Sequence, residues 1–285
     1  MNKQAVLIGL IGSDIQGSAA PELHMTEGER LGLRYIYRLI DLSRLGLDPD
    51  DLPALLEAAE RTGFNGLAIT HPCKQAVIPY LTALSNDAQA LGAVNTIILS
   101  DGKRIGHNTD WIGFAEAFRR NMTNAGKRRV VQLGAGGAGA AVAHAGLTLG
   151  YEVLTLFDMD PRRAAEVVER LTKHFGEGRA VVGSNLEEAI AAADGLVNAT
   201  PIGMDAHPGM PLSPALLRPD LWVSDVIYFP RETELLRHAR ALGAQTSNGG
   251  DMAVYQAAEQ FRLFTGVTPD ANRMHDHFST IGTRS

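Results

Sequence analysis

The chain has 285 residues, of which 45% are hydrophobic and 20% charged, and its formal net charge is −6. At about 150 residues per domain this length predicts two domains. The acidic balance argues against nucleic acid as a partner, and no apolar run is long enough for a membrane span. A single cysteine, Cys73, excludes an internal disulfide and favours a reducing, cytoplasmic location. Composition leaves a monomer and a homodimer equally open.

The first 110 residues alternate between predicted strands and helices. The opening, MNKQAVLIGLIG, reads as a strand entering a glycine turn rather than as a signal peptide. Strands are predicted at 5–11, 35–39 and 66–70, and helices near Pro21, at 51–61 and from about Lys74. A hairpin is expected to turn at Asp101-Gly102. This order favours a largely parallel sheet with one antiparallel excursion.

A connecting helix is expected at 111–120, and a second alternation follows it. The predicted strands are 130–133, 153–157, 179–182, 195–198, 223–228 and 244–246, and the predicted helices are 138–149, 161–174, 186–192 and 232–241. This pattern is typical of a doubly wound sheet. The last two helices, at 252–264 and 270–278, have no partner strand and are expected to return to the first domain.

The strongest motif is RVVQLGAGGAGAAVAHAGLTLGYEVLTLFD, residues 129–158. Gly134, Gly136 and Gly139 have G-x-G-x-x-G spacing, and Asp158 ends the next strand. Such glycines allow a tight turn and close approach of a pyrophosphate to a helix N-terminus. A plain glycine-rich turn is the alternative, but strand, helix, second strand and acid together predict dinucleotide binding. The candidate cofactor contacts here are Gly134, Ala135, Gly136, Gly137, Ala138 and Gly139.

The predicted fold is therefore α/β with two domains. Residues 111–251 would form a Rossmann-type, doubly wound dinucleotide-binding domain. Residues 1–110 and 252–285 would form a mostly parallel α/β domain that binds substrate and carries the catalytic groups.

Asp158 bears on the choice of dinucleotide. Its carboxylate can accept both ribose hydroxyls of the adenosine half and would repel a 2′-phosphate, which favours NAD over NADP. Arg162 and Arg163 could hold such a phosphate, although solvated positions in the first helical turn are their commoner role. Arg163 is kept as a candidate cofactor contact.

Polar residues follow the strands of the first domain, where ligands of open α/β sheets bind. They are Ser13, Ser18, Thr70, Lys74, Asn95 and the run 107–110, a set that suits a small polyhydroxylated ligand. Oxidation of a secondary alcohol needs a base for the hydroxyl proton, and Lys74 is the candidate, held by Asp110. Burial would favour the neutral amine, whereas an adjacent carboxylate would oppose it. Taken singly, Lys74 is more often a surface residue and Asp110 a helix N-cap.

Seven segments in order resemble the shikimate/quinate dehydrogenase family over almost the whole chain. They are LGLIGSDIQGSAAPELH, GFNGLAITHPCKQAV, LGAVNT with GHNTD, LGAGGAG, VNATPIGM, SDVIY and DMAVYQA. The resemblance implies an NAD(P)-dependent dehydrogenase, nearer the NAD-using branch, with Lys74 and Asp110 as the catalytic pair. It implies substrate contacts from Ser18, Thr70, Asn95, Tyr228 and Gln256. It also implies cofactor contacts from Asn198, Thr200, Gly203, Met204, Gly249 and Met252.

Two positions depart from the family pattern. A serine or threonine of the first loop is replaced by Ala20, and an asparagine before Thr70 is replaced by Ala68. A lost hydrogen bond to a charged group costs about 1.5–3 kcal/mol. Weak activity on shikimate or quinate, or preference for an analogue such as aminoshikimate, therefore stays open beside the main interpretation. A non-catalytic dinucleotide sensor is the rival of another class, and a folate-type dehydrogenase is disfavoured because the strand ends are polar.

The remaining reactive residues receive ordinary structural interpretations. Cys73 is more typical of a small buried hydrophobe than of a nucleophile. His107 and Asp110 lack further ligands at metal-binding spacing, so no metal is expected.

Overall fold

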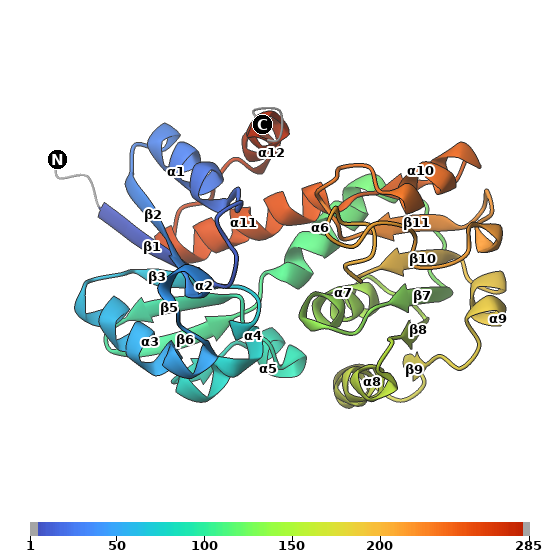
Figure 1. Ribbon diagram of the computed structural model, residues 1–285, viewed down its shortest axis with the longest axis horizontal. Coiled ribbons are helices and arrows are strands. Elements are labelled where there is room, and N and C mark those ends of the chain that lie inside the picture. Colours follow the sequence, from blue (N-terminus) through green and yellow to red (C-terminus); the bar gives the residue numbers. More distant parts are fainter. Residues whose placement is uncertain (1–4, 282–285) are drawn as a thin grey trace. The chain divides into compact units, whose positions relative to one another are not determined.

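The computed structural model describes residues 5–281; the predicted domain limits at residues 1 and 285 and the first four residues of the predicted non-signal N-terminus lie outside this range. Two compact units share the chain. One runs to Thr109 and resumes at Gln256, and the other is Asp110–Tyr255. Each contains a six-stranded sheet with helices around it (Figure 1). The α/β class and the two-sheet organisation are as predicted.

The first unit is built on a mixed sheet. Its strands are β1 (Ala5–Gly12), β2 (Arg34–Asp41), β3 (Gly66–Ile69), β4 (Ala83–Leu84), β5 (Thr96–Ser100) and β6 (Lys103–His107). They lie in the order β2-β1-β3-β5-β6-β4, and β5 is the strand that runs antiparallel to both neighbours. The β5–β6 hairpin turns at Asp101 and Gly102, with φ of 52° and 71°, as a two-residue hairpin turn requires. The predicted parallel sheet with one antiparallel excursion is confirmed.

Helices cover both faces of this sheet. They are α1 (Ala20–Arg30), α2 (Leu42–Leu45), α3 (Leu52–Arg61), α4 (Cys73–Ala76), α5 (Asn86–Leu91), α11 (Gly249–Thr265) and α12 (Ala271–Ile281), with 3₁₀ turns at Pro49–Asp51 and Ile78–Tyr80. One apolar cluster joins Leu52 and Leu56 of α3 to Ile11 and Ile97 of the sheet. A second cluster, on β1 and β2, includes Phe261 and Phe264 of α11. The sheet is thus buried by helices from both ends of the chain.

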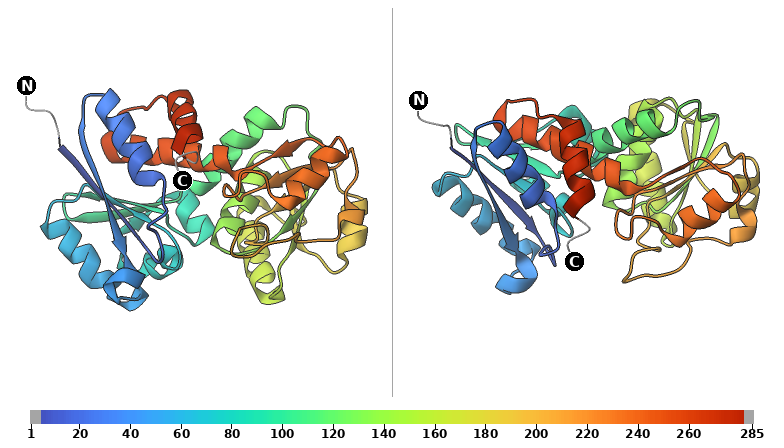
Figure 2. Two further views of the ribbon diagram at one scale, coloured as in Figure 1. Left: turned by 45° about the horizontal axis from the view of Figure 1, so that its top comes forward. Right: turned by 90° about the horizontal axis from the view of Figure 1, so that it is seen from above.

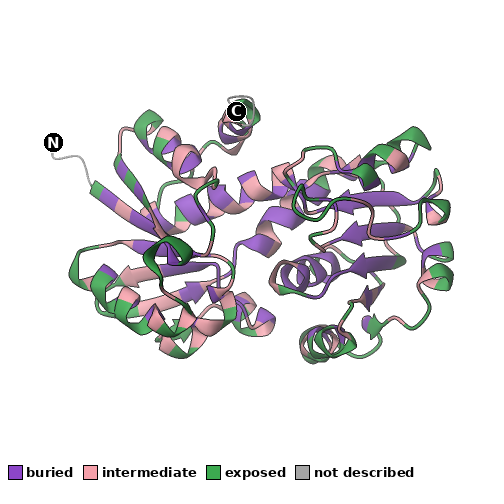
Figure 3. Ribbon diagram, viewed as in Figure 1, coloured by how far each residue is buried: buried purple, intermediate pink, exposed green. Residues whose placement is uncertain are grey.

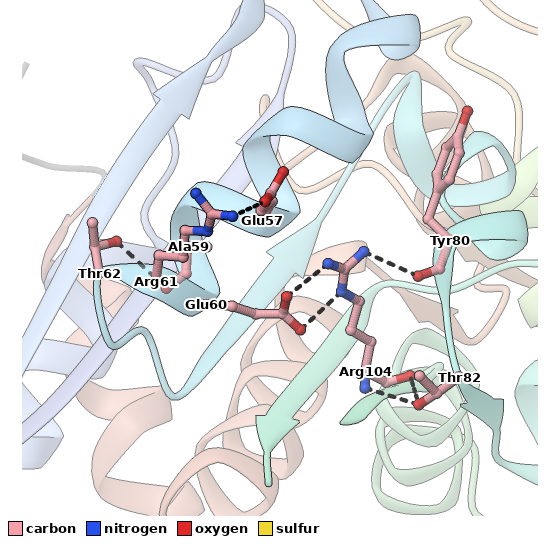
Figure 4. A network of polar contacts seen from close by, with 8 residues as sticks. All are labelled: Glu57, Ala59, Glu60, Arg61, Thr62, Tyr80, Thr82 and Arg104. Carbon is pink, nitrogen blue, oxygen red and sulfur yellow. Dashed lines mark hydrogen bonds and ion pairs between the residues drawn. The ribbon is translucent and has the colours of Figure 1, made fainter. Parts of the chain in front are cut away.

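Helix α3 shows how the sequence pattern produces this packing. Leu52, Leu56 and Ala59 recur at helical spacing and are buried, whereas the polar side carries Glu60. Arg104 of β6 donates to the Glu60 carboxylate through Nε at 2.8 Å and Nη2 at 2.6 Å (Figure 4). The helix is therefore held by an apolar stripe on one side and a two-bonded ion pair on the other.

The two C-terminal helices pack on the first unit. Glu27 of α1 is 1% exposed, and its carboxylate accepts hydrogen bonds from the Asp270 backbone N–H at 2.9 Å and from Arg273 Nε at 2.9 Å. Helix α12 lies beside α1 in both views of Figure 2. A buried carboxylate with these partners fixes the chain end to a helix some 240 residues earlier.

The second unit is a parallel, doubly wound sheet. Its strands are β7 (Arg129–Leu133), β8 (Val153–Phe157), β9 (Ala180–Val182), β10 (Gly195–Asn198), β11 (Trp222–Asp225) and β12 (Thr246–Ser247). The order β12-β11-β10-β7-β8-β9 reverses direction between β7 and β10, which is the dinucleotide-binding topology and its switch point. The Rossmann-type prediction is confirmed.

Helices of the second unit enclose that sheet. They are α6 (Asp110–Asn121), α7 (Gly137–Thr148), α8 (Pro161–Phe175), α9 (Leu186–Ala191) and α10 (Glu234–Ala241), with a 3₁₀ turn at Pro214–Leu216. The central strands β7, β10 and β11 and most of α7 are buried (Figure 3). Alanine and glycine dominate α7, so this helix can lie close to the sheet.

Two predicted strands of this unit were too long. Residues 223–228 were expected as strand, but β11 ends at Asp225 because its carboxylate accepts the Ile227 N–H at 3.1 Å and turns the chain. Residues 244–246 were expected as strand, but β12 consists of Thr246 and Ser247.

Candidate functional site

In the first unit, the loops after β1 and β3 are hydrogen-bonded to each other. Thr70 N donates to Ile11 O at 3.0 Å, and Ser13 N donates to His71 O at 2.9 Å. Cys73 N then donates to Thr70 O at 2.8 Å and opens the single turn of α4. The loop containing Ser13 is thereby placed against the segment that leads from Thr70 to Lys74.

Lys74 lies on α4, half-buried, and the backbone around it is fixed. Its carbonyl accepts the Val94 N–H at 2.8 Å, directly before Asn95. The Asn95 carbonyl accepts the Ile69 N–H at 2.8 Å, one residue before Thr70. Thr70, Lys74 and Asn95 therefore meet at one edge of the sheet, as their strand-end positions predicted.

Asn95 is the centre of a polar network. It is 2% exposed, and its Oδ1 accepts the Thr109 backbone N–H and the Thr96 hydroxyl, each at 2.8 Å. Its Nδ2 donates to Thr109 Oγ1 at 3.0 Å and to Gln256 Oε1 at 3.3 Å. Thr109 Oγ1 also donates to Gln256 Oε1 at 3.4 Å. The structure thus brings the predicted residues Asn95 and Gln256 together.

The roles of two further residues in this network were not predicted from the sequence. Gln260, 4% exposed, donates through Nε2 to Asn95 O at 3.1 Å and to Thr96 Oγ1 at 3.0 Å. Gln260 lies one helical turn after Gln256, so α11 presents two amides to β5. Thr109 belonged to a polar run, but only the fold shows that it joins Asn95 to Gln256.

The other residues predicted to contact substrate or take part in catalysis are Ser18, Asp110 and Tyr228. Ser18 is half-buried in the loop before α1, and its Oγ accepts the Ala20 N–H at 3.3 Å. Asp110 is the first residue of α6 and 7% exposed. Tyr228 follows β11, is 41% exposed and packs its ring on Phe229 with centroids 5.1 Å apart. Asp110 and Tyr228 belong to the second unit.

Cys73 is a core residue, as expected. Its side chain is fully buried in the apolar cluster beneath α3, and burial raises the pKa of the thiol to about 11. A thiol that stays protonated near neutral pH is a poor nucleophile. Cys73 therefore contributes packing beside Lys74 and no chemistry of its own.

Ala20 and Ala68, the two departures, have different surroundings. Ala20 is half-buried at the start of α1, next to Ser18. Ala68 is 2% exposed in the apolar cluster that contains Leu10 and Phe261. We therefore expect an asparagine at position 68 to cost stability in this apolar surrounding. The missing substrate contacts at Ala20 and Ala68 both stay predictions.

In the second unit, the backbone requires glycine at two of the three motif positions and leaves open space at the third. Gly134 has φ of +94°, and a Cβ there would lie 2.6 Å from Ala199 O. A Cβ at Gly139 would collide with Gly134 O, which keeps α7 close to β7. At Gly136 a Cβ would meet no atom within 4 Å, and the residue is exposed. The backbone is thus tight at Gly134 and Gly139 and open at Gly136, where a pyrophosphate could approach.

Gln132 holds the two ends of this glycine loop together through its side-chain amide. It is 1% exposed, and its Nε2 donates to Gly134 O at 2.9 Å and to Gly139 O at 2.8 Å. Within the loop, Gly137 begins α7, and Ala138 follows in its first turn, half-buried. The side-chain amide therefore fixes the turn that presents the helix N-terminus. Its sequence position gave no hint of this role.

Asp158 lies at the end of β8 and contacts the same loop. Its Oδ2 accepts the Ala135 N–H at 2.8 Å, and its Oδ1 accepts the Asp160 N–H at 2.9 Å. Each carboxylate oxygen keeps a further lone pair for a ligand hydroxyl. Asp160 also binds the Arg162 side chain, at 3.1 Å through both Nε and Nη2, whereas Arg163 is exposed.

The segment after β10 is organised by a buried carboxylate. Asn198 Nδ2 donates to Ile202 O and to Asp225 Oδ1, each at 3.1 Å, and Thr200 donates its hydroxyl to Asn198 Oδ1 at 2.7 Å. Asp225 also accepts the Thr233 hydroxyl at 2.8 Å. Burial raises the pKa of Asp225 to about 6, although its hydrogen bonds act in the opposite direction.

The remaining predicted cofactor contacts border that segment. Gly203 has φ of +116°, and Met204 is 41% exposed. Gly249 N donates to Ile227 O at 3.0 Å, and a Cβ at Gly249 would collide with Val226 O. Met252 follows on α11 and is 9% exposed.

Two wider observations concern the described residues 5–281. No three histidine, cysteine, aspartate or glutamate side chains gather there in a way that could hold a metal ion. Among the same residues, none of the helices has the length and apolar character needed to cross a membrane.

Comparison with known proteins adds a family context to this geometry. Residues 10–97 match the model of the shikimate dehydrogenase substrate binding domain, and residues 249–277 match that of the shikimate 5′-dehydrogenase C-terminal domain.

Two curated relatives and one solved structure are similar over nearly their whole length. A shikimate dehydrogenase (NADP(+)) of Streptomyces avermitilis is 56% identical over 96% of this chain and 95% of the relative. A quinate/shikimate dehydrogenase (NAD(+)) of Corynebacterium efficiens is 48% identical over 99% of this chain and all of the relative. Quinate dehydrogenase from Corynebacterium glutamicum in complex with NAD has a TM-score of 0.92 and 46% identity, covering 97% and 99% of the two chains.

Proposed function

Because the chain belongs to the shikimate/quinate dehydrogenase family, we propose that it catalyses reversible oxidation of a ring hydroxyl of shikimate or quinate. The observation that carries this proposal is the polar network of Asn95, Thr109 and Gln256 at the strand edge that also holds Thr70 and Lys74. These are neutral hydrogen-bonding groups beside one cation. Such a set suits a small acid with several hydroxyls.

The first unit supplies most of the substrate contacts in this proposal. Its residues Thr70, Asn95 and Gln256 bind ring hydroxyls, and Ser18 binds the carboxylate. Tyr228, of the second unit, is the further carboxylate contact that the family resemblance implies. Asn95 is held from two sides, since Thr109 and Gln260 fix its side chain and its carbonyl. Pre-ordered groups of this kind lower the entropic cost of orienting a ligand.

In this proposal Lys74 transfers the hydroxyl proton. As the hydride leaves the ring carbon, the Lys74 amine accepts the hydroxyl proton, and Asp110 orients the amine. In the reverse direction the Lys74 ammonium returns the proton to the newly formed alkoxide oxygen. The hydrogen bond from Val94 N to Lys74 O fixes the backbone of this half-buried residue.

The second unit fits a nicotinamide dinucleotide. Gly136 leaves open space beside the α7 N-terminus, which suits a pyrophosphate, while Gly134 and Gly139 keep the loop tight. Asn198, Thr200, Gly203, Met204, Gly249 and Met252 are proposed to line the nicotinamide end. When bound there, NAD would supply the hydride acceptor for the substrate carbon.

NAD is the preferred dinucleotide in this account. Asp158 holds the loop through Ala135 N and keeps lone pairs for the ribose hydroxyls, and its charge disfavours a 2′-phosphate. One relative has NAD(+) in its name and one solved structure of this fold is a complex with NAD, although an NADP(+) enzyme is also among the similar proteins.

The test is NADH formation at 340 nm with shikimate, quinate and aminoshikimate, each with NAD and with NADP. We expect turnover of shikimate or quinate with NAD. Turnover of aminoshikimate alone would favour the analogue enzyme, and binding of NAD without turnover of any of the acids would favour a sensor. Neither alternative is supported by the similar proteins, which are named as shikimate or quinate dehydrogenases.

A further inference from the structure

A second pocket of the first unit takes no part in the proposed reaction. It has a volume of about 430 Å³, which lies within the range of small-molecule sites. Its walls come from the loop before α1, the second half of β2 and the short helix α2, segments drawn in blue in Figure 1. The residues that matter are Gln16, Tyr37, Arg38, Leu39, Arg44 and Leu45.

Two arginines give this pocket its charge. Arg38 and Arg44 are both exposed, and no carboxylate within residues 5–281 forms an ion pair with either side chain. Arginines elsewhere do find partners, as Arg104 and Arg273 do. In a chain of net charge −6, two arginines without an ion pair that line the same pocket favour an anion there.

Asp41 is the carboxylate in the wall of this pocket, and it forms no ion pair with Arg38 or Arg44. Asp41 is 3% exposed, and its oxygens accept the backbone N–H groups of Asp14 and Ile15 and the Gln16 side-chain amide, at 2.8–3.2 Å. The hydrogen bond from Gln16 lowers the pKa of Asp41 most strongly, so the group stays ionised. Its charge is directed into the loop, which disfavours a ligand that carries an ammonium group there.

The rest of the wall offers apolar surface, and the tyrosine hydroxyl behind it is buried. Leu39 is half-buried, and Leu45 is 57% exposed, which is high for a leucine beside a pocket. Tyr37 is 5% exposed, and its hydroxyl has no hydrogen-bond partner among residues 5–281. Burial raises the pKa of Tyr37, so the hydroxyl keeps its proton. The apolar surface of Leu39 and Leu45 is therefore what this wall offers a ligand.

We propose that this pocket binds a small organic carboxylate that lacks a positive charge. Its carboxylate group lies between the Arg38 and Arg44 guanidinium groups, and its apolar part covers Leu39 and Leu45. The site is independent of the proposed dehydrogenase reaction.

Calorimetric titration of the full chain with benzoate tests the proposal, with neither shikimate nor a dinucleotide present. Turnover is then absent, so failure here leaves the proposed reaction untouched, and the arginine variants assign the binding to this pocket. We expect saturable 1:1 binding that Arg38→Gln and Arg44→Gln each weaken by about 10-fold or more, the effect of one lost charged hydrogen bond. Arg34→Gln is the control, since Arg34 lies on the same strand, is exposed and lies outside the pocket wall.

A ligand control needs no variant. Benzamide has the shape of benzoate without its charge and is expected to bind at least about 10-fold more weakly. The proposal is overturned by absence of saturable benzoate binding, by equal loss in Arg34→Gln, or by benzamide binding as tightly as benzoate. Inorganic phosphate binding as tightly as benzoate would equally overturn it, because the site would then take a plain anion.

Discussion

The Asp158 carboxylate accepts the Ala135 backbone N–H at 2.8 Å, so the residue proposed to choose the dinucleotide also fixes the loop that holds its phosphates. Replacing Asp158 by Asn removes the charge and keeps one acceptor. We expect the ratio of kcat/KM for NAD to that for NADP to fall about 10-fold or more, since a charge repulsion of ~1–2 kcal/mol is relieved. Glu166→Gln, an exposed change of equal charge on α8, should leave the ratio unchanged. An unaltered ratio in Asp158→Asn would place the choice elsewhere.

Gln256 is predicted to act on substrate and not on the dinucleotide. Gln256→Ala removes the acceptor that Asn95 Nδ2 and Thr109 Oγ1 share. We expect KM for shikimate to rise about 10- to 100-fold, while KM for NAD changes less than about twofold. Initial-rate kinetics with each substrate varied in turn give both values. Gln89→Ala, on the exposed side of α5, is the matched control. Equal changes in both KM values would contradict a substrate role.

The raised pKa of Asp225 predicts that the free energy of unfolding depends on pH. Its folded-state pKa of about 6 exceeds the ordinary 3.8, so it stays protonated in the folded chain at pH values where the unfolded chain ionises. This contribution to the free energy of unfolding is fully present below about pH 4 and is lost as the pH rises to about 6. Asp225→Asn cannot ionise and should gain up to ~3 kcal/mol relative to wild type between pH 4 and pH 7.

Urea unfolding at pH 4, 5, 6 and 7 measures that difference. Asp205→Asn, which changes the same charge in an exposed loop, should show no comparable trend. A pH-independent difference for Asp225→Asn would mean that Asp225 is ionised in the folded protein throughout.

Ala20 and Ala68, the two departures from the family pattern, should respond to substitution in opposite ways. Ala20→Ser adds a hydroxyl beside Ser18 and is expected to raise kcat/KM for shikimate by about 10-fold, through a hydrogen bond to the substrate carboxylate. Ala68→Asn buries an amide among Leu10 and Phe261 and should lower the free energy of unfolding by about 1–3 kcal/mol without raising activity. Kinetics and urea unfolding of both variants decide this. A gain in kcat/KM from Ala68→Asn would show that residue 68 faces the substrate.

Sequence patterns predicted most of the fold because the apolar periodicity was local and clear. The parallel strands, the hairpin at Asp101-Gly102 and the glycine loop were each marked by neighbouring residues. Helix α5 was missed because six residues are too few for a periodic pattern, although Ser85 caps it and Gly92 ends it. Strand β11 was predicted too long because the chain turn depends on the Asp225 carboxylate, which apolarity does not reveal.

The sequence indicated which residues belong to the site but not which of them form hydrogen bonds with each other. Asn95 and Gln256 are 161 positions apart, and no local pattern indicates that their amides are within hydrogen-bond distance. Gln132 and Gln260 were missed for the same reason, since their roles depend on carbonyls that only the folded chain brings near. Ala68 was interpreted from motif position alone, which did not reveal its burial among apolar side chains.

The central claim is that Lys74 accepts the hydroxyl proton, and kcat of Lys74→Ala with shikimate and NAD measures it most directly. Lys103→Ala is the control, because Lys103 is an exposed lysine on β6 of the same unit. The account predicts a 10²- to 10⁴-fold lower kcat for Lys74→Ala, about the span for loss of a general base, with Lys103→Ala unchanged. A Lys74→Ala enzyme that turns over at the wild-type rate would contradict the proposed chemistry.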